Sequence, residues 1–360
     1  MSLRKLSKQI ILATLFLPAF VFPLYATQWE SVSPLNTARD QFTGGAINGK
    51  IFVFGGNRYP DGLNLKSTEI FDPSNNTWSY RSDNEHNSGM GVEELSGAVY
   101  NGKLYVFGAW GGGNPYGVFN FVEEYNPITD TWISKAPKPT TVAGATAALY
   151  KGEIFLFGGG FSTESGTHTY YDVVEAYNPS TDTWRYVTRM PFKITAMAIG
   201  IVGSKAYLIG GVNPNLTALY SDVIAYDFEL DQWTVSGLGA LTLPRFLPYS
   251  TSAPVIDGKI YLIGGMKCSS WTEECGNTII TTDDVTIYDP SQKSFTSGSP
   301  LSEPVDGHTT ILFNNAIYVL GGSTVSGDSS KITNKVWRLK EDTGEGVKAM
   351  PWIPLLLLDK

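Results

Sequence analysis

The chain has 360 residues, among them 38 glycines, 20 prolines and 13% aromatic residues. This composition is unusual for a helical protein and is typical of many short strands joined by tight turns. Acidic residues outnumber basic ones by 34 to 26, which argues against nucleic acid or an anionic membrane surface as a partner.

The first 26 residues resemble a secretory signal peptide. They contain a basic start, an apolar run over 10–24 and a small residue at the end, Ala26. The run is shorter than the roughly 20 residues that span a bilayer, although a short membrane anchor is the alternative. We predict cleavage after Ala26, a secreted or periplasmic location and no membrane insertion afterwards. The leader holds three of the 26 basic residues and none of the 34 acidic ones, so the mature chain is more acidic still.

Six similar apolar segments follow at intervals of about 50 residues. Most end in Gly-Gly, and several follow an Asn-Gly or Asp-Gly turn, which is typical of the second arm of a β-hairpin. The segments are IFVFGG (51–56), LYVFGA (104–109), IFLFGG (154–159), AYLIGG (206–211), IYLIGG (260–265) and IYVLGG (317–322).

A second set of segments follows five of these hairpins. Each has an aromatic residue, an Asx-Pro type of turn and then a Trp or Phe seven residues after the first aromatic. They are IFDPSNNTW (70–78), EYNPITDTW (124–132), AYNPSTDTW (176–184), AYDFELDQW (225–233) and IYDPSQKSF (287–295). Each unit is therefore predicted to be a four-stranded antiparallel sheet, whose Trp supplies apolar area for packing against the next sheet. The glycine pair stands where a side chain would crowd a neighbouring backbone.

This pattern resembles the kelch repeat over essentially the whole mature chain. The residues that carry the resemblance are the Gly-Gly pairs, four tyrosines and four tryptophans: Tyr125, Tyr177, Tyr226, Tyr288, Trp78, Trp132, Trp184 and Trp233. The resemblance implies an all-β fold, a six-bladed kelch β-propeller. Ala109, Phe71 and Phe295 depart from the pattern in blades 2, 1 and 5.

Trp29 precedes the first Gly-Gly pair by the same interval as several later tryptophans precede theirs. The sixth unit has a third strand at KVWRL (335–339) but no aromatic residue seven positions after it. We therefore expect the segment around Trp29 to pair with 336–339 and to close the ring, which would remove two exposed sheet edges. Residues 347–352 are the alternative closing strand. The expected division is a signal peptide at 1–26, the propeller at 27–340 and a C-terminal tail at 341–360.

The long connections all fall on one face of the predicted ring. They cover residues 57–66, 110–121, 161–171, 212–220, 266–282 and 323–333. Long loops on one face of a rigid scaffold are the usual binding surface. We expect a polar mouth there, formed by Arg39, His86, Glu93, Trp110, His168, Lys193, Arg245, Tyr249, Asp306 and His308, with Asp40 and Glu94 nearby.

The resemblance places a basic residue near the start of each inner strand. In blade 1 this residue is Arg39, nine positions before the hairpin turn. The same count gives Val92, Val142, Lys193, Pro248 and Val305, so a cation is expected in blades 1 and 4 alone. Asp306 and His308 are two apart and are expected to point the same way. No metal site and no cofactor are predicted.

Cys268 and Cys275 are the two cysteines of the chain. In an exported protein, two cysteines this close are expected to form a local disulfide.

The leading functional hypothesis is a secreted, monomeric module that binds a protein or a glycan through its loop face, with catalysis uncertain. The alternative is a sugar epimerase or mutarotase, because the architecture resembles N-acetylneuraminate epimerases. A copper oxidase similar to galactose oxidase is a third hypothesis, and both its cysteine chemistry and its blade number differ from those expected here. Fold alone does not decide between these functions.

Overall fold

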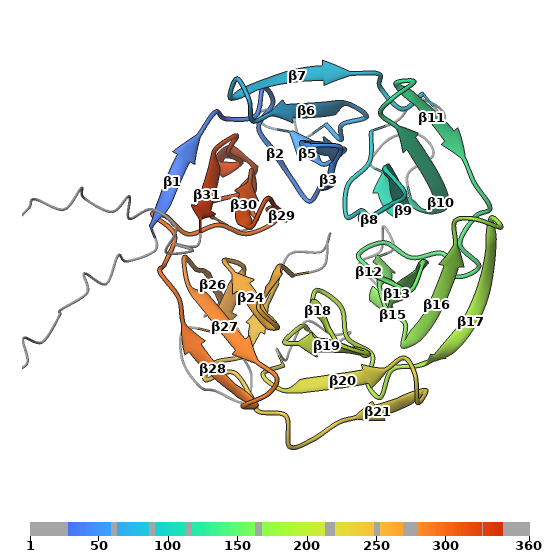
Figure 1. The fold of residues 1–360 in the computed structure, drawn as a ribbon, viewed down its shortest axis with the longest axis vertical. Coiled ribbons are helices and arrows are strands. Elements are labelled where there is room, and N and C mark those ends of the chain that lie inside the picture. The colour runs from blue at the N-terminus through green and yellow to red at the C-terminus, as the bar shows by residue number, and fades with distance from the viewer. Residues whose placement is uncertain are drawn as a thin grey trace, which may run out of the picture.

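The computed structural model describes residues 28–58, 63–85, 91–111, 117–162, 168–212, 220–247, 253–268, 279–325 and 327–340. These residues form six four-stranded antiparallel sheets arranged around a central axis (Figure 1). No α-helix occurs in these ranges; a single-turn 3-10 helix, η3, covers Ser329–Lys331. The predicted β-propeller with six blades is therefore confirmed. Within the same ranges, no helix has the length and apolar character needed to cross a membrane.

The blades follow one another along the chain, each running from the inner to the outer strand. Blade 1 consists of β3 (Thr43–Ile47), β4 (Lys50–Phe54), β6 (Thr68–Asp72) and β7 (Thr77–Arg81). Blade 2 consists of β8 (Ser96–Tyr100), β9 (Lys103–Gly111), β10 (Gly117–Asn126) and β11 (Thr131–Ser134). Blade 3 consists of β12 (Thr146–Tyr150), β13 (Glu153–Phe157), β16 (Val173–Asn178) and β17 (Thr183–Arg189).

The second half of the ring repeats this order. Blade 4 consists of β18 (Ala198–Val202), β19 (Lys205–Ile209), β20 (Val223–Asp227) and β21 (Gln232–Thr234). Blade 5 consists of β23 (Val255–Ile256), β24 (Lys259–Ile263), β27 (Val285–Asp289) and β28 (Ser294–Ser297). Blade 6 consists of β29 (Thr309–Phe313), β30 (Ala316–Leu320), β31 (Val336–Lys340) and β1 (Trp29–Val32).

The outer strand of blade 6 comes from the beginning of the chain. β1 pairs antiparallel with β31, with Trp29 opposite Leu339 and Val32 opposite Val336, and the two strands lie side by side in Figure 1. The predicted pairing is thus present. β30 occupies the other edge of β31, so both edges of this strand are paired. Residues 347–352, the alternative closing strand, lie outside the described residues.

Tryptophan side chains link neighbouring blades at the outer rim. The indole N–H of Trp78 donates to the carbonyl oxygen of Ser33 at 2.8 Å, and that of Trp184 donates to Ala136 at 2.9 Å. Trp29 donates in the same way to Ser299 at 2.9 Å. Trp29 therefore occupies the repeat position that its spacing predicts.

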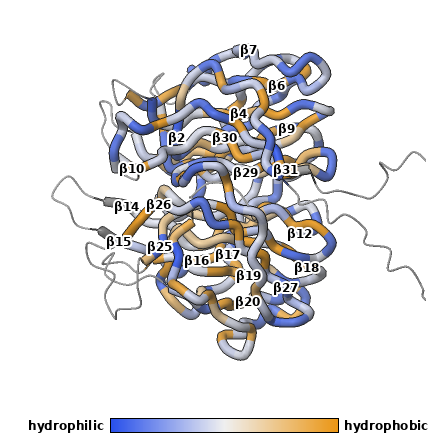
Figure 2. Tube along the Cα trace, turned by 90° about the vertical axis from the view of Figure 1, so that its left-hand side faces the viewer, coloured by the Kyte–Doolittle hydropathy of each residue, from blue (hydrophilic) through white to orange (hydrophobic). Residues whose placement is uncertain are grey.

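The two faces of the ring differ in their connections. We call the face that carries the six long connections the loop face, and the face with the short hairpin turns the turn face. Three small sheets extend the loop face: β2 (Arg39–Asp40) with β5 (Asn57–Arg58), β14 (Gly160–Ser162) with β15 (His168–Tyr170), and β22 (Arg245–Phe246) with β25 (Met266–Cys268) and β26 (Ile279–Thr281). Figure 2 shows β14, β15, β25 and β26 on one side of the ring. The predicted asymmetry between the faces is present.

The glycine pairs allow adjacent blades to approach at the loop face. A Cβ on Gly321 would lie 2.5 Å from the carbonyl oxygen of Arg39, and one on Gly264 would lie 2.5 Å from that of Val305. Real Cβ atoms do not approach backbone so closely, and both glycines have positive φ. The backbone N–H of the following glycine, Gly322, donates to the same Arg39 oxygen at 2.8 Å. The predicted reason for these glycines is therefore correct.

Candidate functional site

The loop-face end of the central channel is built from one repeated position. In each blade, the residue just before the inner strand pairs with a residue at the start of the long connection, as Asp40 does with Asn57 and Asp306 with Ser323. The residues at this position are Asp40, Glu93, Ala143, Thr195, Phe246 and Asp306. Three of the six blades therefore place a carboxylate at the mouth.

In four blades, the next residue belongs to a chain of backbone hydrogen bonds from blade to blade. Gln41 N–H donates to Gly307 at 2.7 Å, Glu94 N–H donates to Gln41 at 2.9 Å, and Gly144 N–H donates to Glu94 at 2.9 Å. Gln41, Glu94, Gly144 and Gly307 all have positive φ, which is uncommon for residues other than glycine. This chain of bonds ties blade 6 to blades 1, 2 and 3 and holds the acidic residues close together.

Burial raises the pKa values of two carboxyl groups at the mouth. Burial raises the pKa of Asp40 to about 8, helped by the negative charges of Glu93 and Asp306. Burial also raises the pKa of Glu93, opposed by hydrogen bonds from the side chains of Asn57 and Asn64. Like charges in a partly buried site disfavour ionisation of each member. The mouth therefore holds mainly acidic side chains, whereas the sequence predicts a mixture of acidic and basic ones.

Glu94 forms an extension of the same group. Burial and the neighbouring charge of Glu93 raise its pKa to about 7. On the far side, burial and the charge of Glu94 raise the pKa of Tyr170 to about 12. Two carboxyl groups, on Asp40 and Glu94, thus titrate near neutral pH, in the range in which a side chain can transfer protons.

Arg39 does not line the mouth. Its side chain is fully buried and forms a 2.6 Å ion pair with Glu69 on β6. The guanidinium also donates to the carbonyl oxygens of Gly55 at 2.9 Å and Ser67 at 3.2 Å. Burial lowers the pKa of Arg39, opposed by the charge of Glu69. The prediction of a ligand-binding arginine is wrong, because this side chain satisfies backbone groups at the corner of blade 1.

Arg245 plays the same part in blade 5. It is buried and donates to the carbonyl oxygen of Gly264 at 2.9 Å and to that of Asp284 at 2.6 Å. Burial lowers its pKa to about 10, opposed by the charge of Asp284. Its carbonyl oxygen faces Gly210 just as that of Arg39 faces Gly321. Arg245 is therefore the structural equivalent of Arg39.

This equivalence corrects the predicted register of two blades. In blade 4 the hairpin turn is at Gly203, and the carbonyl that faces the glycine pair belongs to Ile194, not to Lys193. Lys193 is exposed. In blade 5 the equivalent residue is Arg245, not Pro248, because the connection to the hairpin has three more residues. The repeat therefore carries its cations in blades 1 and 5, and both are buried.

Asp306 and His308 do not point the same way. Gly307 between them has a φ of +64°, so the backbone here is not an extended strand. Asp306 is nearly buried and adds its charge to the field at Asp40. His308 packs instead against the first glycine of blade 5, Gly264. Burial and the charge of Arg245 lower the pKa of His308 to about 3, so it is neutral.

The remaining predicted site residues are spread over the loop face. Trp110 pairs with Glu93 through two backbone hydrogen bonds of 2.8 and 2.9 Å. His168 begins β15, opposite Ser162. His86, Tyr249 and Cys275 lie outside the described residues, so the predicted disulfide stays a prediction; its other member, Cys268, is buried on β25. In the described ranges, no three His, Cys, Asp or Glu side chains are grouped so that they could hold a metal ion.

One class of buried polar residues was missed by sequence reasoning. Glu69, Glu123 and Glu175 occupy equivalent positions on the third strands of blades 1 to 3 and are buried. Glu175 pairs with the buried Lys138 at 2.5 Å. The available signal was a glutamate among apolar strand residues, two positions before the aromatic residue of the third strand in blades 1 to 3. A buried carboxylate needs a partner.

Comparison with known proteins agrees with this architecture. The family model described as Attractin/LZTR1 beta-propeller matches residues 14–273 and 134–340. The chain belongs to this β-propeller family. A solved chain described as "Structure of YjhT" superimposes with a TM-score of 0.67 at 18% identity, covering 85% of this chain and 96% of that chain. That likeness shows the fold alone.

Among curated proteins, this propeller is similar to several with kelch-like names. It is 28% identical to Kelch-like protein 25 of Xenopus tropicalis, covering 73% of this chain and 41% of that protein. It is 26% identical to Kelch-like protein 35 of Mus musculus, covering 63% and 35%, and 27% identical to Kelch-like protein terF of Aspergillus terreus, covering 64% and 50%. The chain thus spans between about a third and a half of these relatives. The kelch-repeat assignment is confirmed.

Proposed function

We propose that this protein is an exported binding module that engages a protein partner through the loop face. The observation that carries the proposal is a set of large apolar side chains exposed among the long connections. Leu63, Phe192, Ile280 and Val325 are between 44% and 57% exposed and come from blades 1, 3–4, 5 and 6. Exposed apolar groups rimmed by polar ones are typical of protein-binding surfaces.

The burial of the two arginines favours a binding surface rather than a catalytic site. Arg39 and Arg245 are the arginines expected to hold an anionic substrate group, and both are occupied by atoms of the chain itself. The charges of Glu93 and Asp306 leave a negative centre within the apolar rim. A protein partner that places apolar side chains on the rim and a basic side chain at the centre fits this surface.

The experiment is capture of a partner by the immobilised mature chain from source-cell extract and medium, followed by titration of the purified partner. Phe192→Asp and Ile280→Asp are expected to abolish binding, because each places a charge in the apolar rim. The matched control is Tyr186→Asp on the outer strand β17, where the side chain is 60% exposed on the circumference of the ring. Binding that survives both rim substitutions contradicts the proposal, and a melting shift with free sugars alone favours a glycan.

The alternative is an enzyme that acts on a sugar and resembles N-acetylneuraminate epimerase. It is favoured by the raised pKa values of Asp40 and Glu94, which suit a general acid and base near neutral pH. Faster exchange of sugar anomers, measured by NMR, that is lost in Glu94→Gln would support this function. Exchange rates that stay unchanged for neutral sugars and sialic acids would contradict this alternative and favour the binding module.

Export is supported by the sequence of residues 1–26. Mass spectrometry of the protein purified from its source should find Thr27 as the first residue. A peptide map without reducing agent should join the peptides that contain Cys268 and Cys275. An intact leader in the purified protein would favour a membrane anchor instead.

A further inference from the structure

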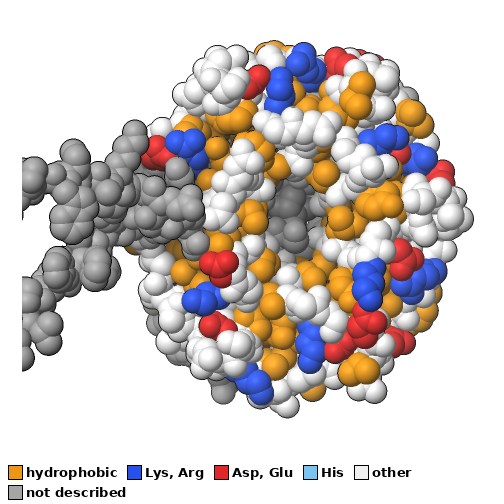
Figure 3. Space-filling view, in the orientation of Figure 1, with side chains coloured by type: hydrophobic (Ala, Val, Ile, Leu, Met, Phe, Trp, Pro, Cys, Tyr) orange, Lys and Arg blue, Asp and Glu red, His pale blue; other side chains and the backbone are white. Residues whose placement is uncertain are grey.

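The turn-face end of the central channel contains an apolar cavity with a volume of about 360 Å³. Figure 3 shows the hollow at the centre of this face, with hydrophobic side chains around it. In the described part of the chain, no residue that lines the cavity has a charged side chain. This end therefore lacks the carboxyl groups that surround the loop-face end.

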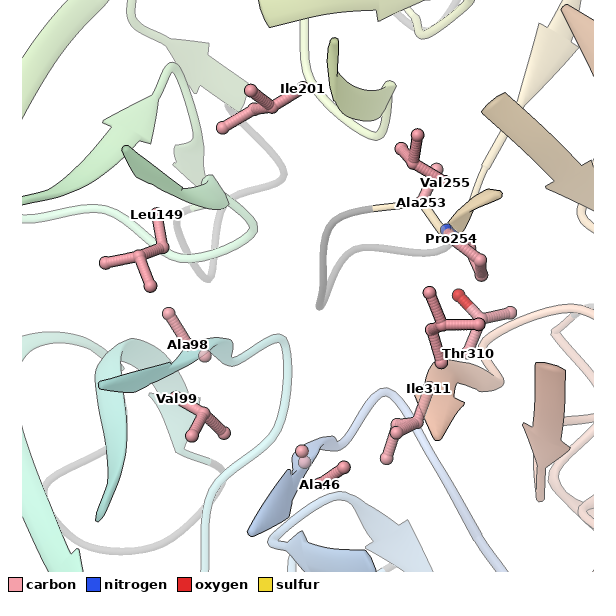
Figure 4. Close-up of a pocket in the computed structure, with 14 residues that line it drawn as sticks. Ala46, Ala98, Val99, Leu149, Ile201, Ala253, Pro254, Val255, Thr310 and Ile311 are labelled. Carbon is pink, nitrogen blue, oxygen red and sulfur yellow. The ribbon is translucent and has the colours of Figure 1, made fainter. Parts of the chain in front are cut away.

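One position of the repeat supplies a side chain to this cavity from every blade. It is the residue that pairs one step inward from the hairpin turn between the first and second strands. The six residues are Ala46, Val99, Leu149, Ile201, Val255 and Leu312, and Figure 4 labels the first five around the channel. All six are apolar, and the alanine of blade 1 fills the least space.

The backbone at this position adds polar groups to the apolar wall. In blade 1, Ile47 and Lys50 flank the two-residue turn, and such a flanking pair exchanges both of its backbone hydrogen bonds. The next pair, Ala46 with Ile51, therefore directs its N–H and C=O groups outward, which for Ala46 means toward the channel. A wall of apolar side chains with a few polar groups is typical of small-molecule sites.

Contacts between neighbouring inner strands keep the cavity open. A Cβ on Gly45 of blade 1 would collide with the side chain of Val99 in blade 2, so these two strands cannot approach further. On the other side of blade 1, the hydroxyl group of Thr309 donates to the carbonyl oxygen of Phe42 at 2.6 Å. The cavity is therefore preformed, and it cannot close by moving the blades together.

The charged side chains near this end of the channel are paired with each other. Lys50, which follows the hairpin turn of blade 1, lies 3.0 Å from Asp72. Lys103, at the equivalent position of blade 2, lies 2.5 Å from Glu124. An ion placed in the apolar cavity would find no partner for its charge, which is costly. The cavity therefore favours an uncharged ligand.

The volume of the cavity sets the size of that ligand. A cavity of roughly 150 Å³ lined by apolar side chains holds benzene, and ligand sites usually span about 300–1,000 Å³. A volume of about 360 Å³ thus has room for a molecule of the size of two fused rings. Water and ligands can reach it, because Leu149 and Leu312 are 39% and 38% exposed.

We propose that the turn-face cavity binds an uncharged, largely apolar small molecule of about two fused rings, with a hydrogen-bonding group at its edge. The apolar body lies against the six side chains, and the polar edge meets an N–H or C=O group of an inner strand. The proposal concerns the face opposite the proposed partner surface, and it does not depend on that function. A second copy of the chain is the competing occupant.

The test uses the full chain, expressed and processed in its source cells, and the fluorophore 6-propionyl-2-(dimethylamino)naphthalene. This probe is uncharged and has two fused rings and a ketone oxygen. We expect saturable binding at a single site, with emission shifted to shorter wavelength. At pH 7, uncharged 2-naphthol should displace the probe. The anion 2-naphthalenesulfonate should need at least about ten times the concentration, because the cavity offers no partner for its charge.

Substitutions locate the probe. Ala46→Leu fills the cavity from blade 1 and should weaken binding at least about tenfold, because the added side chain takes the volume that the probe needs. Leu149→Lys with Leu312→Lys places charges at exposed positions of the cavity wall and should also weaken it. The matched control is Ile128→Lys with Leu230→Lys, which changes residues 83% and 64% exposed in outer turns of the same face. It should leave the affinity unchanged.

Each contrary result has a distinct meaning. Absence of saturable binding would overturn the proposal, as would binding that survives both Ala46→Leu and the double lysine variant of the cavity. An equal loss in the control variant, or in Phe192→Asp on the loop face, would place the probe elsewhere and overturn it too. A dimer in sedimentation that the cavity variant dissociates would show that a second copy covers the cavity. Where Ala46→Leu does not fold, as judged by its melting curve, the double lysine variant decides.

Discussion

Arg39 and Asp40 are neighbours in the chain, yet their environments are opposite. Arg39 is fully buried with a carboxylate and two carbonyl oxygens as partners. Asp40 is half-buried and faces the charges of Glu93 and Asp306. Burial disfavours the charged form of both side chains. The charge and hydrogen bond of Glu69 oppose this effect at Arg39, whereas repulsion from Glu93 and Asp306 adds to it at Asp40. We infer that the blade corners contribute to stability and that the mouth costs stability, as sites reserved for a ligand often do.

The largest effect should come from removing the strand that leads into the Arg39 corner. Deletion of residues 27–35 removes β1, leaving one edge of β31 unpaired. It also removes the indole of Trp29 from Ser299. We expect this variant not to fold, because an open ring exposes two sheet edges and the apolar area between blades 5, 6 and 1. Circular dichroism and thermal melting measure this.

A deletion variant that melts at the temperature of the intact chain would show that the pairing of β1 with β31 is dispensable. Deletion of residues 350–360, which lie beyond β31 in the sequence, is the control. It should leave the melting transition cooperative, since no described strand is lost.

The second effect concerns the corner itself. Glu69→Ala removes the partner of Arg39 and the acceptor of two backbone N–H groups, those of Asn36 at 2.8 Å and Thr37 at 3.1 Å. Breaking a buried ion pair by removing one member costs about 3–5 kcal/mol, because the other charge stays buried. Urea unfolding at pH 7 should show a loss of this size.

The matched control is an exposed ion pair of similar geometry. Lys335 and Glu303 lie 2.6 Å apart with side chains 53% and 27% exposed. Glu303→Ala should cost less than about 1 kcal/mol, because water screens such pairs. If both variants lost the same free energy of unfolding, the buried ion pair at the blade corner would stabilise the fold no more than the exposed pair does.

The repeats made most of the fold predictable from the sequence. Gly-Gly pairs, hairpin turns and spaced tryptophans predict the strand order, the number of blades and the position of Trp29. Each of these motifs arises from a local constraint, either on the backbone conformation or on the packing of side chains. The same local logic explains the agreement at Gly321, where a carbonyl of the next blade leaves no room for a Cβ. Fold prediction succeeded where one repeat could be checked against five others.

The site was less predictable because side-chain direction and burial are not local properties. Arg39 and Arg245 look like binding residues in sequence, and their partners are 16 to 39 residues away in the chain. Counting back from the hairpin turn failed in blade 5, where the connection is three residues longer. The direction of His308 depended on one left-handed glycine, Gly307. None of these is visible in the spacing of motifs.

A third effect concerns His308, whose side chain is uncharged, although the nearby mouth holds carboxyl groups. Its pKa is about 3 in the folded chain, through burial and the charge of Arg245, and about 6.5 when unfolded. The unfolded chain thus binds the proton first as the pH falls below 6.5, and the folded state loses stability. His308→Leu should remove this loss, which amounts to about 2 kcal/mol at pH 5.

Leucine is a suitable replacement because the same repeat position holds Phe42, Leu95 and Met197 in blades 1, 2 and 4. Urea unfolding at pH 7 and pH 5 measures the difference. If the intact chain and the variant lose the same stability between these pH values, His308 is not the group responsible.

The smallest effect should come from Asp40, and it has the opposite dependence on pH. The pKa of Asp40 is raised to about 8 by burial and then by Glu93 and Asp306. The folded chain therefore holds a proton that the unfolded chain releases near pH 4, and stability falls as the pH rises from about 4 to 8. Asp40→Asn should stabilise the protein by about 1 kcal/mol at pH 9 and hardly at all at pH 4, since water partly screens a half-buried carboxylate.

The control for this substitution lies at the other end of the channel. Asp257 is exposed in the hairpin turn of blade 5, where blades 1 and 2 have Asn48 and Asn101. Asp257→Asn is a surface substitution of the same kind and should change the free energy of unfolding at pH 9 by less than about 0.5 kcal/mol. If Asp40→Asn instead destabilises the protein at pH 9, the carboxylate is held by favourable contacts, and the mouth resembles the corner at Arg39. A gain in stability accompanied by weaker partner binding would show that the repulsion at the mouth serves the ligand.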